Sequence, residues 1–147
     1  MTHTWLSRTI RAPTTAVFET VANATNYTKA VSDIVKVEFL TDQRSGVGTR
    51  FRETRVMGRR AATTEIEVTE YVANERIRMV SDAGGTVWDS IFTVTPVEDG
   101  DATRLELVME ARPYRLLSRI LVPLTKGIVS KAIASDMDAV KAHLEAR

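Results

Sequence analysis

Residues 76–112 read RIRMVSDAGGTVWDSIFTVTPVEDGDATRLELVMEAR, and the topology of the chain follows from this segment. Apolar and polar residues alternate through it, as is typical of β-strands. The pairs Gly84-Gly85 and Asp99-Gly100 interrupt the alternation, and both suit tight turns because glycine and aspartate tolerate positive φ. Since a short turn joins antiparallel neighbours, the segment predicts three consecutive antiparallel strands.

The turns also predict which residues lie opposite one another, because side chains alternate between the two faces of a strand. A third turn, Gly58-Arg59, extends the reasoning to another hairpin. Together the turns place these pairs on one face: Phe51 with Ile66, Glu53 with Thr64, Ile77 with Phe92, Met79 with Ser90, Ser81 with Trp88, Phe92 with Leu107, and Ser90 with Met109. On the other face Asp89 lies opposite Glu110, an unfavourable pair that Arg112 is near enough to relieve.

The other segments complete an α+β chain. Four more strand-like runs are Thr4–Arg11, Ile34–Thr41, Thr49–Met57 and Ala61–Val72. Between the first two of these runs we predict two short helices, one capped by Thr14 or Thr15 and a second over Asn26–Ser32.

The last segment, Tyr114–Ala146, is predicted to be helical because its apolar residues recur at steps of three and four. Pro113 suits the first turn of such a helix. Pro123 and Gly127 do not suit a helix interior. We therefore expect a kink or break between Val122 and Ile128 and a straight helix from about Ile128 to Glu145.

Several short segments resemble the polyketide cyclase/dehydrase and lipid-transfer superfamily (SRPBCC), which includes START domains and birch-pollen-allergen-like proteins. They are Ile10-Arg11-Ala12-Pro13 followed by Val17-Phe18, Gly46-Val47-Gly48-Thr49, Val68-Thr69-Glu70-Tyr71, Thr93-Val94-Thr95-Pro96 with Asp99-Gly100 and Thr103-Arg104, and Asp138-Ala139-Val140-Lys141 with Leu144-Glu145. The resemblance implies a helix-grip fold, in which a curved seven-stranded antiparallel sheet holds a long C-terminal helix. Members of the superfamily range from polyketide cyclases to binders of lipids and hormones.

Composition sets wider limits. A chain of 147 residues is predicted to form one domain, residues 1–147. It contains no cysteine, which excludes disulfides and thiolate chemistry. The 20 basic and 19 acidic residues leave a net charge of +1, too balanced for a protein whose main partner is nucleic acid. Met1–Ile10 lacks the features of a signal peptide, so we expect a cytoplasmic location.

In a helix-grip fold the space between sheet and helix becomes a cavity for a ligand. The residues that the derived inner face and the helix stripe would supply to it are Phe51, Glu53, Ile66, Met79, Trp88, Ser90, Phe92, Leu107, Met109, Leu117, Leu121, Leu124 and Ile128. Taken singly, each apolar member is better explained as packed core. As a set, the Met, Trp and Phe side chains favour a deformable pocket for a hydrophobic or aromatic molecule.

Charged residues are expected on the same face. Glu53 and Arg55 share it, and Arg8 points inward if Ile10 does. Because a buried charge is costly unless paired, these residues either form an internal ion pair, lie in water at the cavity mouth, or fix a polar end of the ligand. They are also the candidate catalytic residues, since a carboxylate in an apolar pocket has a raised pKa and can act as a general acid.

Motifs for other chemistry are missing from the sequence. There is no H-E-x-x-H and no G-x-S-x-G, and Gly46-Val47-Gly48 precedes a strand instead of a helix. His3 and His143 lie near the chain ends, and no His, Asp and Glu residues have metal-ligand spacing. We therefore predict neither a cofactor nor a metal.

Three functions remain open: a binder of a hydrophobic molecule, a cyclase or dehydratase that uses the same cavity, and a lipid shuttle that docks on membranes. The third rests on the stretch from Pro113 to Ser135, which has no acidic residue and carries Arg115, Arg119 and Lys126. The simpler interpretation of this stretch is the solvated outer face of a core helix. The sequence does not indicate an oligomeric state.

Overall fold

A computed structural model describes residues 2–146, so the two ends of the predicted domain, Met1 and Arg147, lie outside the described residues. In chain order the elements are β1 (Thr2–Ile10), α1 (Thr14–Ala22), α2 (Ala24–Ala30), β2 (Ile34–Phe39), β3 (Arg50–Met57), β4 (Arg60–Val72), β5 (Arg76–Ala83), β6 (Thr86–Val97), the short helix η1 (Glu98–Gly100), β7 (Ala102–Pro113), α3 (Leu116–Leu124) and α4 (Lys126–Glu145). The predicted helix-grip fold is confirmed.

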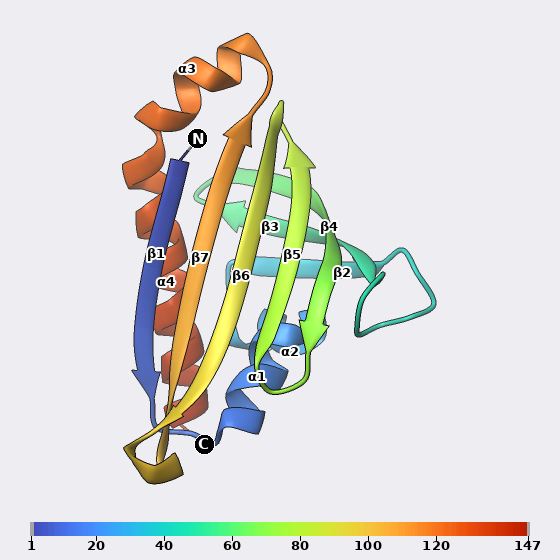
Figure 1. Ribbon diagram of the computed structural model, residues 1–147. Helices are drawn as coiled ribbons and strands as arrows, with labels where there is room; N and C mark the ends of the chain where they lie inside the picture. The colour runs from blue at the N-terminus through green and yellow to red at the C-terminus, as the bar shows by residue number, and fades with distance from the viewer. Residues whose placement is uncertain (1, 147) are drawn as a thin grey trace.

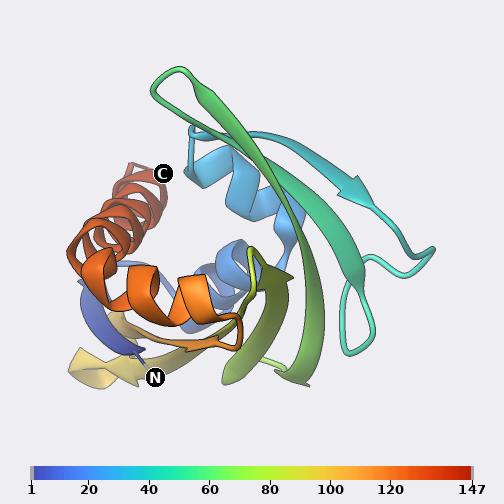
Figure 2. The ribbon, with the colours of Figure 1, turned by 90° about the horizontal axis from the view of Figure 1, so that it is seen from above.

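The seven strands form one antiparallel sheet in the order β1-β7-β6-β5-β4-β3-β2. The sheet curves around α1 and α2, and α4 lies along its open side (Figures 1 and 2). The core between these layers includes Ile10 and Leu105 from the sheet, Val17 from α1, and Met137 and Val140 from α4, each with at most 1% of its surface exposed. Burial of this apolar surface is the main stabilising contribution.

The predicted strand pairings are confirmed. Phe51 lies opposite Ile66 across β3 and β4, and Phe92 lies opposite both Ile77 and Leu107. The other pairs derived from the three turns are present in the same register. The alternation of side chains therefore gives the sheet the inner face that the sequence predicts.

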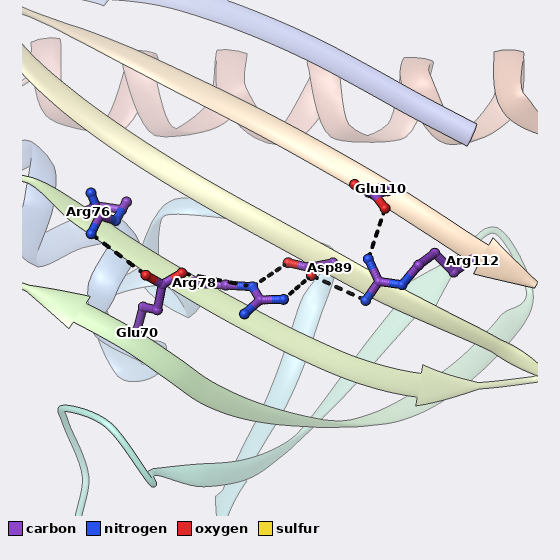
Figure 3. Close-up of polar contacts among 6 residues, drawn as sticks. All are labelled: Glu70, Arg76, Arg78, Asp89, Glu110 and Arg112. Carbon is purple, nitrogen blue, oxygen red and sulfur yellow. Dashed lines mark hydrogen bonds and ion pairs between the residues drawn. The ribbon is translucent and has the colours of Figure 1, made fainter. Parts of the chain in front are cut away.

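On the opposite face of the sheet, Asp89 of β6 accepts hydrogen bonds from Arg78 (Nε, 2.9 Å) and Arg112 (Nη2, 3.3 Å), as Figure 3 shows. Arg112 also donates to Glu110, which lies opposite Asp89 in the ladder, at 2.9 Å. The predicted relief of this like-charge pair by Arg112 is confirmed. Arg78 is a second donor that the sequence reasoning did not include.

Three local predictions about helix starts were wrong. Neither Thr14 nor Thr15 caps α1, because Thr14 is already its first residue. The N-cap position is Pro13, which has no side-chain oxygen to accept a hydrogen bond from the helix. The second helix begins at Ala24, two residues earlier than predicted, because the side chain of Asn23 accepts a hydrogen bond from the backbone N–H of Asn26 at 3.0 Å. Pro113 ends β7 instead of starting a helix.

The predicted break in the C-terminal helix is confirmed, and it lies at Thr125. Its backbone N–H donates to the carbonyl oxygens of Leu121 and Val122, both at 3.1 Å, and thereby closes α3. The straight helix α4 begins directly afterwards at Lys126, two residues earlier than predicted. The break changes the direction of the chain, so α3 and α4 do not share one continuous stripe (Figure 2).

Candidate functional site

A cavity of about 370 Å³ lies between the concave face of the sheet and the helices α2 and α4. Nine of the residues predicted to form the ligand site line it, all from the sheet: Phe51, Glu53, Ile66, Met79, Trp88, Ser90, Phe92, Leu107 and Met109. Their positions follow from the strand register, because each is on the inward side of the alternation.

The other four predicted site residues are on the outside of the molecule. Leu117, Leu121, Leu124 and Ile128 have between 46% and 75% of their surface exposed, and none lines the cavity. The prediction was wrong because it carried one apolar stripe through Thr125, where the helix ends and restarts. In α4 the residues that reach the cavity are Val129, Ala132, Ile133 and Asp136.

One corner of the cavity is polar. The guanidinium of Arg55 donates to both carboxylate oxygens of Asp136, at 2.8 and 2.9 Å, and to Glu53 at 3.3 Å. The hydroxyl of Tyr27 donates to Asp136 at 3.3 Å. All four side chains line the cavity. The expected internal ion pair therefore exists between Glu53 and Arg55, with Asp136 as the stronger partner of the arginine.

Burial changes the acid–base properties of this corner. It raises the pKa of Glu53 above the ordinary value of 4.5, an effect that neighbouring Arg55 opposes and Asp136 reinforces. Burial, together with the charge of Asp136, raises the pKa of Tyr27 well above 10.0. For Arg55, burial lowers the pKa, but the hydrogen bonds and charge of Asp136 outweigh it and raise the pKa overall. The corner thus holds a fixed cation and a carboxyl group that takes up a proton readily.

Arg8 does not belong to this corner. As predicted for a residue two positions before the buried Ile10, its side chain faces the terminal helix. There its Nε donates to the carboxylate of Asp138 at 2.6 Å, and it does not line the cavity. The candidate role of Arg8 at the site was therefore wrong, because the ion pair with Asp138 of α4 holds the Arg8 guanidinium away from the cavity.

Tyr27 and Asp136 are site residues that sequence reasoning missed. Asp136 carried a usable signal, since it lies three residues after Ile133 and four before Val140 and so shares their buried helix face. A carboxylate on that face needs a cationic partner. Tyr27 carried no comparable signal, because the sequence alone does not fix how α2 faces the sheet.

Within residues 2–146, no three His, Asp or Glu side chains come together in an arrangement that could hold a metal ion. The polar corner has its own cation in Arg55, and that guanidinium already bonds both carboxylates. The corner can form hydrogen bonds to a bound molecule and exchange protons with it, in a cavity that is otherwise apolar.

The fold and the cavity can be set beside known proteins. A sequence model of the family described as polyketide cyclase / dehydrase and lipid transport matches residues 1–147. The chain belongs to this family. Among curated proteins, no sequence matches it.

Solved structures of the same fold include a protein from Thermus thermophilus, with 18% identity, a TM-score of 0.78, and coverage of 99% of this chain and 98% of that one. The di-domain ARO/CYC BexL from the BE-7585A biosynthetic pathway has 16% identity and a TM-score of 0.80, and the match covers 99% of this chain but 47% of that one. Norcoclaurine synthase from Thalictrum flavum, in complex with dopamine and hydroxybenzaldehyde, has 16% identity, a TM-score of 0.68, and coverage of 96% of this chain and 84% of that one. At these identities the likeness concerns the fold.

Proposed function

We propose that this protein binds a hydrophobic or aromatic small molecule, lipid-like or polyketide-like, in the cavity between the sheet and α4. The supporting observation is a void of about 370 Å³ with a largely apolar lining. Protein interiors leave few spaces larger than a water molecule, whereas small-molecule sites measure about 300–1,000 Å³. Membership of a family that includes lipid transport supports the same function.

The polar corner restricts the chemistry of the ligand. It combines one cation, Arg55, with two carboxyl groups, Glu53 and Asp136, and Arg55 bonds to both of them. An anionic head group placed in this corner would meet two acidic groups and a cation that is already paired with both. The other cation that lines the cavity, Arg44, stacks on the ring of Phe39 instead. A hydroxyl or phenol can instead donate to Glu53, so the preferred ligand is an apolar molecule with a neutral polar end.

Tryptophan fluorescence tests this proposal. The chain has two tryptophans, so the exposed Trp5 can be replaced by phenylalanine, which leaves Trp88 in the cavity as the single reporter. Titration with β-naphthol should change the emission of Trp88 in a saturable way. β-Naphthoate should bind about tenfold more weakly, equivalent to about 1.4 kcal/mol, because its carboxylate would lie beside Glu53. Equal affinity for the two probes would refute the assignment of the corner.

A matched pair of variants checks that the probe is inside the cavity. Ala132→Phe places a ring in the void, and Ala142→Phe places the same ring on the exposed side of the same helix. Binding should be lost in the first variant and kept in the second, with similar stability, because the added ring fills empty space instead of displacing packed atoms. Loss in both or in neither would contradict a site in the cavity.

The natural ligand can be sought directly. Native mass spectrometry of the protein purified from its own host should detect a small molecule that remains bound. The ligand mass should be absent from the Ala132→Phe variant and present on the Ala142→Phe variant. A wild-type protein that is always free of added mass, and that also fails to bind β-naphthol, would overturn the proposed function.

A second candidate is an enzyme of the cyclase or dehydratase type, favoured by the raised pKa of Glu53 inside the cavity. In a dehydration, solvent water would take the proton from the carbon beside the carbonyl, which forms the enolate. Protonated Glu53 would then donate its proton to the departing hydroxyl group, which leaves as water. Arg55 uses three of its five N–H donors on Asp136 and Glu53, so a remaining donor could steady the enolate. With a phenyl-substituted β-hydroxyketone as probe, Glu53→Gln should abolish formation of the conjugated enone and leave the affinity for the probe largely intact. An affinity change alone would exclude the catalytic role.

A further inference from the structure

The outward face of α3 is almost entirely aliphatic. Leu116, Leu117, Ile120, Leu121 and Leu124 lie on one side of the helix, and each has between 46% and 77% of its surface exposed. Ile128, at the start of α4, is 72% exposed as well. We call these six residues the α3 surface. Contiguous exposed apolar patches of this kind mark interaction sites in soluble proteins.

This exposure is built into the way α3 is attached. The opposite side of α3 carries Ser118 and Val122, its two buried residues. The Ser118 hydroxyl donates to the carbonyl oxygen of Gly84 at 2.6 Å, and the Tyr114 hydroxyl donates to Asp82 at 2.8 Å. Rotating the leucines inward would break the Ser118 bond and expose Val122, so the α3 surface is directed outward in the folded protein.

Cations surround the α3 surface. Arg115, Arg119, Lys126 and Lys131 are all exposed, and none of them takes part in an ion pair within the described residues 2–146. The segment from Pro113 to Ser135 contains no acidic residue. The surface is therefore apolar and positively charged at the same time.

Charge complementarity selects the partner. If two copies of this chain met through the α3 surface, their cations would face one another with no carboxylate between them, which is unfavourable. An anionic lipid surface offers an apolar layer in which the leucines can be buried. It also carries phosphate groups that attract the cations. We propose that α3 docks this protein on an anionic membrane, with its leucines inserted at the boundary between head groups and acyl chains.

The dimensions of the helix fit a surface position. Within residues 2–146, no helix has the length and hydropathy required to cross a membrane. The nine residues of α3 are enough to lie in the plane of the interface, where apolar side chains penetrate about 5–10 Å. On its inner side Val122 borders a small void together with Trp88 and Met109, which also line the cavity. Docking thus brings the cavity close to the bilayer, although the docking itself does not depend on what the cavity holds.

Co-sedimentation with lipid vesicles tests the proposal. At low salt the protein should bind vesicles of phosphatidylcholine mixed with phosphatidylglycerol, and should bind vesicles of phosphatidylcholine alone much more weakly. Replacing Arg119 and Lys126 with glutamine should weaken binding roughly fivefold for each cation removed. Replacing Leu117 and Leu121 with glutamine should weaken it by at least about tenfold.

Two control variants match these changes elsewhere on the surface. Val35→Gln with Val47→Gln removes two aliphatic side chains that are 58% and 57% exposed, and Arg59→Gln with Arg60→Gln removes two exposed cations. Both controls should bind like the unmodified protein. Binding of β-naphthol, measured without vesicles, should be unchanged in all four variants, which separates this test from that of the proposed function.

Three results would overturn the proposal. The first is no binding to the anionic vesicles at low salt. The second is an equal loss of binding in the α3 variants and their controls. The third is sedimentation equilibrium showing a dimer that Leu117→Gln with Leu121→Gln dissociates, which would assign the α3 surface to a second copy of the chain.

Discussion

Arg55 of β3 and Asp136 of α4 are joined by two hydrogen bonds of 2.8 and 2.9 Å across 81 residues of sequence. The pair ties the far part of the sheet to the terminal helix at the polar corner of the cavity. Charged, bidentate bonds of this kind are about twice as strong as neutral ones. The same pair therefore supports both the fold and the arrangement of the site.

The variant Asp136→Asn should lower the free energy of unfolding by about 3 kcal/mol, because it leaves the buried Arg55 with Glu53 as its main partner. Urea unfolding measures the loss. The double variant with Arg55→Met should recover part of it, since the unpaired cation is then also removed. A single variant as stable as the unmodified protein would show that the pair contributes nothing.

Glu53 should make stability depend on pH. Its pKa is raised above 4.5 in the folded protein, so the folded state keeps this proton at pH values where the unfolded chain has released it. The free energy of unfolding therefore falls as pH rises from the ordinary pKa to the raised one. In Glu53→Gln this fall should be absent, so the stability of the variant relative to the unmodified protein should rise with pH and then level off. Urea unfolding over a pH series tests this, and the exposed Glu75→Gln should show no such trend.

Asp89 should act in the opposite direction. Hydrogen bonding from Arg78 is the main cause that lowers its pKa below 3.8, so its stabilising contribution is present above that pH and is lost as pH falls through the lowered value. Asp89→Asn should cost about 1–2 kcal/mol at neutral pH, since both of its arginine partners keep access to water. The cost should vanish in acid. Thermal unfolding over a pH series measures both effects. Asp101→Asn, at an exposed position, serves as the control in that series.

Gly85 should be more sensitive to substitution than its neighbour Gly84. Both have positive φ, at 82° and 62°, but a Cβ at Gly85 would lie 2.7 Å from the Arg115 side chain and 2.8 Å from Ser118, whereas a Cβ at Gly84 meets nothing within 4 Å. Gly84→Ala should cost about 1 kcal/mol from backbone strain alone. Gly85→Ala should cost more and should loosen α3, which hydrogen exchange at Val122 would detect. Equal losses of stability in the two variants would mean that α3 can shift to accommodate the added methyl group without cost.

The sheet could be predicted almost completely because its register depends on local information. Two-residue turns and alternating side chains were enough to place Phe92 opposite Ile77 and Leu107. The nine cavity residues from the sheet followed directly from that register. Local signals of this kind are reliable because each turn fixes only its own two strands.

The helical side of the site could be predicted only in part. The stripe of Ile133, Met137 and Val140 is buried as its spacing indicates, but the stripe before Thr125 belongs to a different helix with a different orientation. The break in the helix can be located from Pro123. The relative orientation of α3 and α4, however, depends on contacts such as that of Ser118 with Gly84. The bond from Arg55 to Asp136, the orientation of Tyr27 and the cavity volume depend on packing between distant segments, which a pattern of residues does not contain.

The pairing of β1 with β7 has a consequence for synthesis on the ribosome. Thr2–Ile10 is translated about a hundred residues before its neighbour in the sheet, Ala102–Pro113. Until β7 emerges, β1 has an unsatisfied edge that other chains can occupy, and late closure of this kind slows folding. We expect nascent chains stopped before residue 102 to depend on chaperones such as holdases, and chains released after residue 113 to depend on them much less.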